Sequence, residues 1–378
     1  MEIVRVSNEN NFKGLRDIWN QILFENGSDN IFLTWEWLFH WWETFKDKND
    51  ELYILAGIED GKIAAIAPFY LHKGYLREIR FLGSGIVCSE YLSFICRRQD
   101  ADLFARQVYV YLRKNIRQWD LISLEGILSG DCSITAFKTL ASKGRLDIKT
   151  IKKHRCFYLS LRDQKIPGPR KEKIEYRKRK LNRKGRLEFE QSDGQSYTAV
   201  CGKYKTLVAL HQKRWQEMQH KKGGLFENRL FRKFMDKITA VFHENRWLNI
   251  SILTMDTEKI AAYYSFTFNG KISGYLTGFD PAYKNYSPGA VCLWESICYF
   301  GEKGFTEFDF LRGEEEYKRD WSENYRTIEN VVIGQNGIRA FLYIRSKTFF
   351  EFLKGIARKT LSPRLFAHIR AVKFKQSR

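Results

Sequence analysis

Residues 250–268 read ISILTMDTEKIAAYYSFTF, and they repeat the layout of residues 53–70, YILAGIEDGKIAAIAPFY. Both stretches alternate apolar and polar residues around a short polar break, the pattern of two antiparallel strands joined by a tight turn. The tetrapeptide KIAA stands at residues 62–65 and again at residues 259–262. A recurrence of this kind indicates two copies of one folded unit.

The segments that follow the two hairpins agree in order as well. In both copies the hairpin precedes a further extended stretch, a helix and a final buried strand. In the first copy the extended stretch is expected at 91–95, the helix at 100–115 and the strand at 119–126. In the second copy they are expected at 272–279, 288–301 and 308–313. The fold class expected is therefore α+β, with one such unit in each half.

Length and composition set the number of domains and the class of protein. The chain has 378 residues, 44% of them hydrophobic, which suffices for two cores and is too apolar for disorder. We expect domains at 1–162 and 163–338, then a basic helical tail at 339–378. Seven cysteines without a Cys-x-x-Cys pair argue against a disulfide framework, and seven histidines without ligand spacing argue against a metal site. The sequence shows neither a signal peptide nor a transmembrane run, so a cytoplasmic protein is expected.

Positive charge is concentrated in two segments. The chain has 64 Lys and Arg against 44 Asp and Glu, a formal charge of +20. Residues 165–186 hold eleven basic and two acidic residues, and residues 339–378 hold eleven basic and one acidic residue. The expected partners are therefore anionic: nucleic acid, phosphorylated metabolites or a lipid surface.

Each basic segment has two interpretations. The first is predicted to be a proline-broken linker at 163–170 that leads into a basic helix ending at Gly185, either solvated or in contact with an anion. The tail has apolar residues along one helical face, namely Phe349, Phe352, Leu353, Ile356 and Ala357. It is expected either to lie on an anionic membrane surface, such as the inner face of the cell membrane, or to pack onto the second domain.

The loop DPAYKNYSPGA, residues 280–290, precedes the helix of the second copy. Ser287 is a natural N-cap, so the positive end of that helix faces the loop. Lys284 adds a charge, and Gly289 lets a ligand approach the backbone. The loop is either an ordinary capped helix start or a phosphate site. The matching residues of the first copy, 97–100, contain no glycine, so the second copy is the expected cofactor site.

The order of these elements resembles the core of the GNAT acyltransferases, whose phosphate loop reads Gln/Arg-x-x-Gly-x-Gly/Ala. Residues 284–289, KNYSPG, look like a variant in which Lys replaces Gln/Arg and Ser replaces the first Gly. Residues 308–321, FDFLRGEEEYKRDW, closely resemble the DF-L-x-G-x-E-x-YK-x-x-W signature of the CelD-like, FemAB-related tandem GNAT proteins. Further similarity lies at residues 32–37, 82–83, 211–215 and 287–289, so that the resemblance covers roughly residues 1–335.

The resemblance implies two tandem GNAT-like domains with mixed sheets that face one cleft, the first with a degenerate cofactor site. The implied reaction moves an acyl group, acetyl as first choice, directly from acetyl-CoA or another acyl-CoA to an amine, such as an amino sugar of exopolysaccharide or cell-envelope synthesis. One alternative is a Fem-like ligase that takes its amino acid from tRNA, which the basic helix favours. The other is a non-catalytic membrane-surface module of a polysaccharide machine. DNA is not an expected partner.

Acyl transfer to an amine needs a base, a donor for the developing oxyanion and a proton for the leaving group. Four residues are predicted to be catalytic: Glu315 as a partly desolvated base, Lys318 as phosphate binder or carbonyl polariser, Tyr317 as proton donor and Asp309 as an orienting group. The alternative is that this segment is only a turn, held by an ion pair between Glu314 and Lys318. The predicted cofactor-binding residues are Lys284, Ser287, Gly289 and Ala290. The predicted acceptor contacts are Glu90, Tyr91 and Trp35, the last within a tryptophan cluster that either stacks on sugar or packs in the core.

Overall fold

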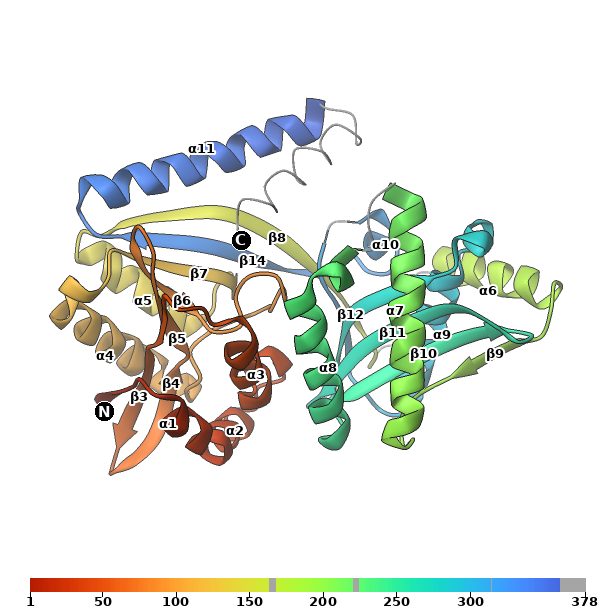
Figure 1. Ribbon diagram of the computed structural model, residues 1–378, viewed down its shortest axis with the longest axis horizontal. Helices are drawn as coiled ribbons and strands as arrows, with labels where there is room; N and C mark the ends of the chain where they lie inside the picture. The colour runs from red at the N-terminus through yellow and green to blue at the C-terminus, as the bar shows by residue number, and fades with distance from the viewer. Residues whose placement is uncertain (163–167, 220–223, 314, 361–378) are drawn as a thin grey trace.

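The computed structural model describes residues 1–162, 168–219, 224–313 and 315–360. Most of the expected linker, Glu314 and the end of the tail lie outside the described residues. The molecule is elongated, and its two halves lie side by side (Figure 1). Within the described residues, strands form an 11-stranded sheet and a 3-stranded sheet.

Both halves contain strands and helices. The first half contains β1 (Glu2–Val6), α1 (Glu9–Gly14), α2 (Arg16–Glu25), α3 (Trp35–Phe45), β2 (Asp50–Leu52), β3 (Ile54–Glu59), β4 (Lys62–Ala67), β5 (Phe69–Lys73), β6 (Arg77–Phe81), α4 (Ala101–Lys114), β7 (Leu121–Leu128), α5 (Cys132–Lys143) and β8 (Asp147–Ser160). The second half contains α6 (Gly168–Asn182), β9 (Leu187–Glu190), α7 (Tyr197–Gln219), α8 (Arg229–Glu244), β10 (Leu248–Met255), β11 (Glu258–Phe268), β12 (Lys271–Phe279), the 3-10 helix η5 (Pro281–Tyr286), α9 (Pro288–Glu302), β13 (Glu307–Arg312), α10 (Glu316–Arg319), β14 (Tyr325–Gly334) and α11 (Ile338–Thr360). The predicted α+β class with mixed sheets is confirmed.

The two predicted hairpins are present. Strands β3 and β4 pair antiparallel around Asp60 and Gly61, and β10 pairs antiparallel with β11. Both turn residues of the first hairpin have positive φ, 50° and 74°, as a tight hairpin of this kind requires. The repeated KIAA tetrapeptide begins β4 in the first half and lies near the start of β11 in the second. The local repeat in the sequence therefore marks a structural repeat.

Each half contains a pair of parallel strands that diverge. Strand β12 pairs with β13 only through residues 271–273, and β6 pairs with β7 only through residues 78–80. In the first half the chain itself runs beside the diverging strand: the N–H of Leu92 donates to the Gly126 carbonyl of β7 at 3.1 Å, and Ile95 forms a bridge with Ile66 of β4. In the first half, Leu92 and Ile95 therefore connect β7 and β4 through the backbone.

The last strand of each half pairs with the other half. Strand β8 ends the first half but pairs with β13, and β14 ends the second half but pairs with β7. Between these neighbours β8 and β14 pair with each other over most of their length, and both run across the middle of the molecule (Figure 1). The full strand order is β2-β5-β6-β7-β14-β8-β13-β12-β11-β10-β9. One sheet therefore connects both halves.

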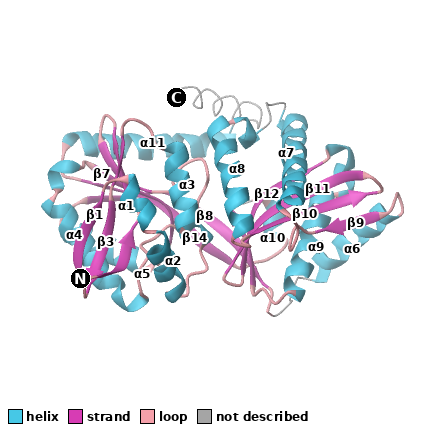
Figure 2. Cartoon of the chain, turned by 60° about the horizontal axis from the view of Figure 1, so that its bottom comes forward, coloured by secondary structure: helices cyan, strands magenta, loops and turns pink. Residues whose placement is uncertain are grey.

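Helices cover both faces of the second-half strands. Helices α7 and α8 lie on one side of β10 to β12, and α9 with α6 lies on the other (Figures 1 and 2). The basic helix α6 is attached through Ile174 and Leu181, which are fully buried, and through Glu175, which accepts a hydrogen bond from Trp294 of α9 at 2.9 Å. The predicted basic helix is therefore a docked element that exposes most of its cations.

The junction of the halves is aromatic. Trp37 of α3 is fully buried, and its ring centroid lies 4.8 Å from that of Phe234 on α8. Helix α11 begins where the tail was expected and packs on the sheet through Ala340 and Ile344. No helix among the described residues is long and apolar enough to span a bilayer.

Candidate functional site

A cavity of about 350 Å³ lies beside the end of β12, where this strand has diverged from β13. We call it the basic cavity; it is lined by Arg170, Lys173, Arg177, Arg214, Tyr263, Thr277, Phe279, Lys284, Ser287, Pro288, Gly289, Ala290, Leu293, Tyr317 and Asp320. These residues include all four predicted cofactor-binding residues and Tyr317. All of them belong to the second half, so this cavity is not a cleft between the two domains.

The turn that opens α9 differs from a capped helix start. Asp280 caps η5 by accepting the N–H of Ala282 at 3.0 Å. Ser287 occupies the N-cap position of α9, but its side chain makes no capping hydrogen bond and its φ and ψ are 50° and 56°. A residue with a Cβ holds this left-handed conformation at a cost, which explains why glycine suits the equivalent position of the GNAT loop pattern.

Gly289 follows at the start of α9. A Cβ built on Gly289 would meet only Phe279, at 3.5 Å, which is ordinary van der Waals contact. Packing within the chain therefore does not require glycine at this position. The missing side chain leaves the positive end of α9 open to the cavity, where an anion is favoured.

Five cationic side chains and one carboxylate line the basic cavity. Arg170, Lys173 and Arg177 follow the i, i+3, i+7 spacing of one face of α6. Arg170 is buried and donates to the carboxylate, Asp320, at 2.8 Å. Lys284 makes an ion pair of 3.2 Å with Glu217 at the exposed rim. The excess of positive charge suits a ligand with several negative charges.

Arg214 was not predicted as a site residue. It projects from α7, its guanidinium stacks over the Phe279 ring at 5.2 Å, and within the described part of the chain it has no carboxylate partner. Burial lowers the pKa of this guanidinium below its ordinary value, so a bound anion would stabilise its charge. Its place within the HxxRW segment, which resembles the family, is the signal that could have identified it.

Two tyrosines add hydroxyl groups to the cavity. Tyr263 projects from β11 and Tyr317 from α10. Burial is the main cause that raises the pKa of both phenols, and for Tyr317 the negative charge of Glu315 raises it further. Both hydroxyls therefore stay protonated at neutral pH and are hydrogen-bond donors to a ligand.

The predicted base and cation lie beside the cavity and do not line it. Glu315 is 57% exposed, so the expected desolvation is wrong, and its carboxylate lies 3.2 Å from Lys318 Nζ. Lys318 is buried and donates to the carbonyls of Arg312 at 2.7 Å and Leu311 at 3.3 Å. These two hydrogen bonds from Lys318 fix the position of the last residues of β13. Glu314, its expected partner, lies outside the described residues.

Asp309 belongs to a buried ionic network. Its carboxylate accepts hydrogen bonds from Tyr91 Oη and from the N–H of Leu311, both at 2.8 Å. Lys271 Nζ lies 3.4 Å and Arg326 lies 3.7 Å from the same carboxylate. Asp309 therefore lies within β13, where other side chains and the backbone of the protein already occupy its carboxylate, and it does not line the basic cavity.

The predicted acceptor contacts also have partners within the protein. Glu90 is fully buried and forms an ion pair with Arg312 of β13. Burial raises the pKa of Glu90, and the charge of Arg312 opposes that shift. Trp35 is buried, stacks on Phe39 at 4.2 Å and donates to the Phe12 carbonyl. The core interpretation of the tryptophans agrees with this geometry.

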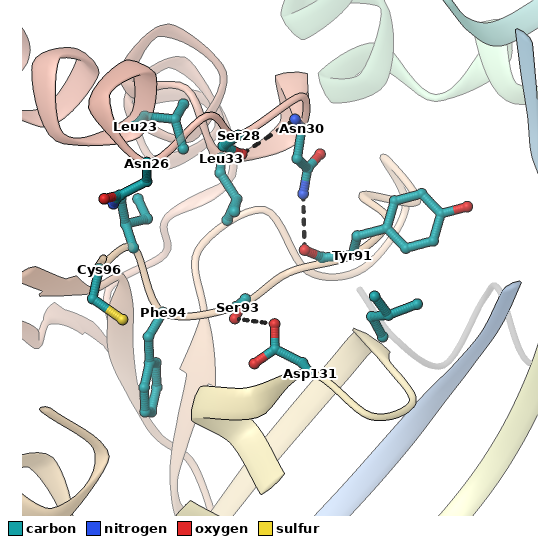
Figure 3. A pocket seen from close by; sticks show the side chains of 12 residues that line it. Leu23, Asn26, Ser28, Asn30, Leu33, Tyr91, Ser93, Phe94, Cys96 and Asp131 are labelled. Carbon is teal, nitrogen blue, oxygen red and sulfur yellow. Dashed lines mark hydrogen bonds between the residues drawn. The ribbon is translucent and has the colours of Figure 1, made fainter. Parts of the chain in front are cut away.

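A second cavity, of about 210 Å³, lies in the first half (Figure 3). Tyr91 lines it, and Asn30 donates to the Tyr91 carbonyl at 2.8 Å. Ser93 donates to the Asp131 carboxylate at 2.8 Å (Figure 3). No lysine or arginine lines this cavity, so it lacks the charge that distinguishes the basic cavity.

One surface group brings possible metal ligands together. Asp47, Asp50 and His72 have ligand atoms within 4.8 Å of one another, the one such group found among the described residues. Both carboxylates already accept backbone hydrogen bonds within the turn at 47–50, and His72 bonds to Asp50 at 2.8 Å. These hydrogen bonds of the turn explain why the three side chains lie close together.

Comparison with known proteins finds a family match in the second half. Residues 169–319 match the family described as "Acetyltransferase (GNAT) domain". No curated protein matches the chain. Among solved structures the chain is similar to FemX, with 10% identity, a TM-score of 0.58 and coverage of 88% of this chain and 97% of that one.

Two further structures are similar. A conserved protein of unknown function from Bacteroides thetaiotaomicron has 10% identity, a TM-score of 0.55 and coverage of 88% and 100%. L-PGS from Bacillus licheniformis has 13% identity, a TM-score of 0.52 and coverage of 88% and 96%. At these identities the likeness concerns the fold alone. The diverging strands and the loop at the start of α9 both lie within residues 169–319, the range that matches the GNAT acetyltransferase family.

Proposed function

We propose that the chain transfers an acyl group from an acyl-CoA to an amine in the basic cavity. The observation that carries the proposal is the convergence of five cations, an open helix start and Gly289 beside diverging strands. An acyl-CoA carries several phosphate charges and a thioester, and the cavity offers positive groups for the phosphates and neutral hydroxyl donors for the thioester.

In the proposed reaction the amine nitrogen bonds to the acyl carbon and the carbon–sulfur bond breaks. Tyr317 and Tyr263 donate hydrogen bonds toward the charge that develops on the acyl oxygen or the sulfur. Their raised pKa values favour this role over full proton donation. Glu315, exposed beside Tyr317, takes the proton that the nitrogen loses, and solvent protonates the sulfur. Asp309 and Lys318 position the strand end that carries this segment.

The acceptor that we propose, on the family resemblance, is the amine of a sugar or another small molecule of polysaccharide or envelope synthesis. Release of free thiol from acetyl-CoA tests the reaction, with glucosamine and a panel of other amines as acceptors. We expect thiol release that requires both substrates, is lost in Gly289→Asp and is slowed in Tyr317→Phe. Release no faster than in the absence of protein, across the panel, would contradict the proposal.

A second candidate is a Fem-like ligase that takes an aminoacyl group from tRNA. It is favoured by the cations of α6 that do not line the cavity, among them Lys171, Arg179 and Lys180, all exposed. Phosphate contacts by several such side chains make RNA binding fall steeply with salt. Titration of tRNA at increasing salt concentration tests this candidate; a flat salt dependence would remove it.

A further inference from the structure

Helix α11 (Ile338–Thr360) runs along the outer surface of the sheet, above β8 and β14 (Figure 1). Ala340 and Ile344 are buried against the sheet, in one cluster with Leu121 and Val332. The inward face of the helix is therefore occupied by the protein's own core.

The outward face of α11 carries a row of apolar side chains. Ile338, Leu342, Phe349 and Leu353 are between 44% and 71% exposed. At 100° per residue these four positions fall within an arc of about 60°, on the side of the helix opposite Ala340 and Ile344. We call them the outer apolar row. Single exposed apolar residues are common on soluble proteins, but several on one face of a helix mark an interaction surface.

Positive charge accompanies this row. From Ile338 to Thr360 the sequence has six Lys and Arg and a single acid, Glu351. Arg345 lies at the edge of the row, with its guanidinium 5.0 Å above the exposed Phe341 ring. A long side chain in this position covers apolar surface with its stem and keeps its charge at the polar boundary. Lys347, in contrast, points inward and lies 3.6 Å from Glu78 of β6.

We propose that α11 docks on an anionic lipid surface, with the outer apolar row in the boundary between headgroups and acyl chains. An apolar face with flanking cations is the combination that such a surface binds. A second copy of this chain would bring two helices of the same positive charge together, and RNA would contact the cations and leave the outer apolar row in water. The chemistry of the row therefore fits a lipid surface better than either alternative. The docking extends beyond the proposed acyl transfer and does not depend on it.

Sedimentation of the full chain with vesicles tests the proposal. The vesicles contain phosphatidylcholine alone or phosphatidylcholine with phosphatidylglycerol. We expect the chain to bind the vesicles that contain phosphatidylglycerol, and the double variant Leu342→Gln/Leu353→Gln to lose at least about tenfold in partitioning. Leu103→Gln is the matched control, because Leu103 is an exposed leucine on α4, and its partitioning should equal that of the wild type.

Circular dichroism and the unfolding midpoint verify that both variants fold. Absence of binding to either vesicle by the wild type would overturn the proposal. Equal binding of the wild type and the double variant would also overturn it. A dimer in sedimentation equilibrium that the double variant dissociates would show instead that the row contacts a second copy. Binding to tRNA that competes with the vesicles and depends on the row would assign it to RNA.

Discussion

Ser287 holds a backbone conformation that ordinarily favours glycine, and its side chain makes no capping bond. The first prediction concerns this position. Ser287→Gly removes the strain of a Cβ at φ 50° and should raise the free energy of unfolding by about 0.5–1 kcal/mol, after the larger entropy of the unfolded glycine is subtracted. Urea unfolding measures the change. Ser287→Ala, which keeps the Cβ, should give no gain; a less stable glycine variant would show that the serine hydroxyl matters.

Gly313, between β13 and α10, is the opposite case. Its φ is 136°, and an added Cβ would lie 2.1 Å from Glu315 Oε2 and 2.7 Å from Lys318 Nζ. The second prediction is that Gly313→Ala lowers the free energy of unfolding by about 1–3 kcal/mol and disturbs the segment that carries Tyr317.

Gly301 in α9 is the matched control, because it has open space around it and no positive φ. Gly301→Ala should therefore raise the free energy of unfolding by about 0.5–1 kcal/mol. The reverse order of stabilities in thermal unfolding would contradict this account.

The sequence indicated some site residues well and others poorly. The loop at 284–290 is continuous in the chain, so its residues could be recognised together, and the structure brings them to one cavity. Glu315 and Lys318 are also neighbours in sequence, but their exposure and partners depend on how the chain bends at Gly313. Arg214 reaches the cavity from a helix about seventy residues before the loop, so the loop pattern does not include it and only the family-like HxxRW segment could have indicated it.

At the scale of elements, one face of α6 is part of the ligand site. Arg177 lines the basic cavity, whereas Arg179 on the same helix does not and is exposed. The third prediction is that Arg177→Ala weakens coenzyme A binding about tenfold, the order of magnitude of one charge-assisted contact, and that Arg179→Ala leaves it unchanged. Isothermal titration compares the two variants. An equal loss in both would indicate a diffuse effect of charge and no specific contact.

Helix α7 supplies a pH-dependent contribution to stability. His211 is buried, its Nε2 accepts a hydrogen bond from Trp215 at 3.1 Å, and burial lowers its pKa to about 4. A histidine whose pKa is lower in the folded state contributes stability that is present above the unfolded pKa of about 6.5 and is lost as the pH falls toward 4.

The fourth prediction is that wild-type stability falls by about 2–3 kcal/mol from this group between pH 6.5 and 4. His211→Gln, which cannot ionise, should show a shallower decline over that interval. The measurement is urea unfolding at a series of pH values. His243, a half-buried histidine of α8, provides the control variant His243→Gln, and a decline flattened equally in both variants would show that the effect is not specific to His211. Parallel profiles for His211→Gln and the wild type would contradict the assignment.

Element types could be predicted from the sequence because hairpin alternation and helix starts are local signals. The hairpins at β3–β4 and β10–β11 and the helix α9 are where the pattern placed them. The contact face of α6 could not be predicted, because its charges surround the axis and only packing by Ile174 and Leu181 decides which of them face inward.

At the scale of the molecule, the exchange of β8 and β14 makes each half depend on the other. The fifth prediction is therefore a single cooperative unfolding transition in calorimetry, although the chain contains two copies of one unit. Fragments ending at residue 162 or beginning at 163 should fail to fold separately, since each lacks a central strand of its sheet. Two resolved transitions, or a folded first fragment, would contradict this expectation. Strand exchange is a non-local choice of partner, so the sequence repeat alone did not reveal it.

The proposed function depends on the binding of an acyl-CoA in the basic cavity. Isothermal titration of the chain with coenzyme A tests it most directly, with Gly289→Asp placing a carboxylate in the open helix start and Gly301→Asp placing the same carboxylate at the far end of α9. We expect binding by the wild type and by Gly301→Asp, and a loss of at least about tenfold in Gly289→Asp. No binding by the wild type, or equal binding by all three proteins, would contradict it.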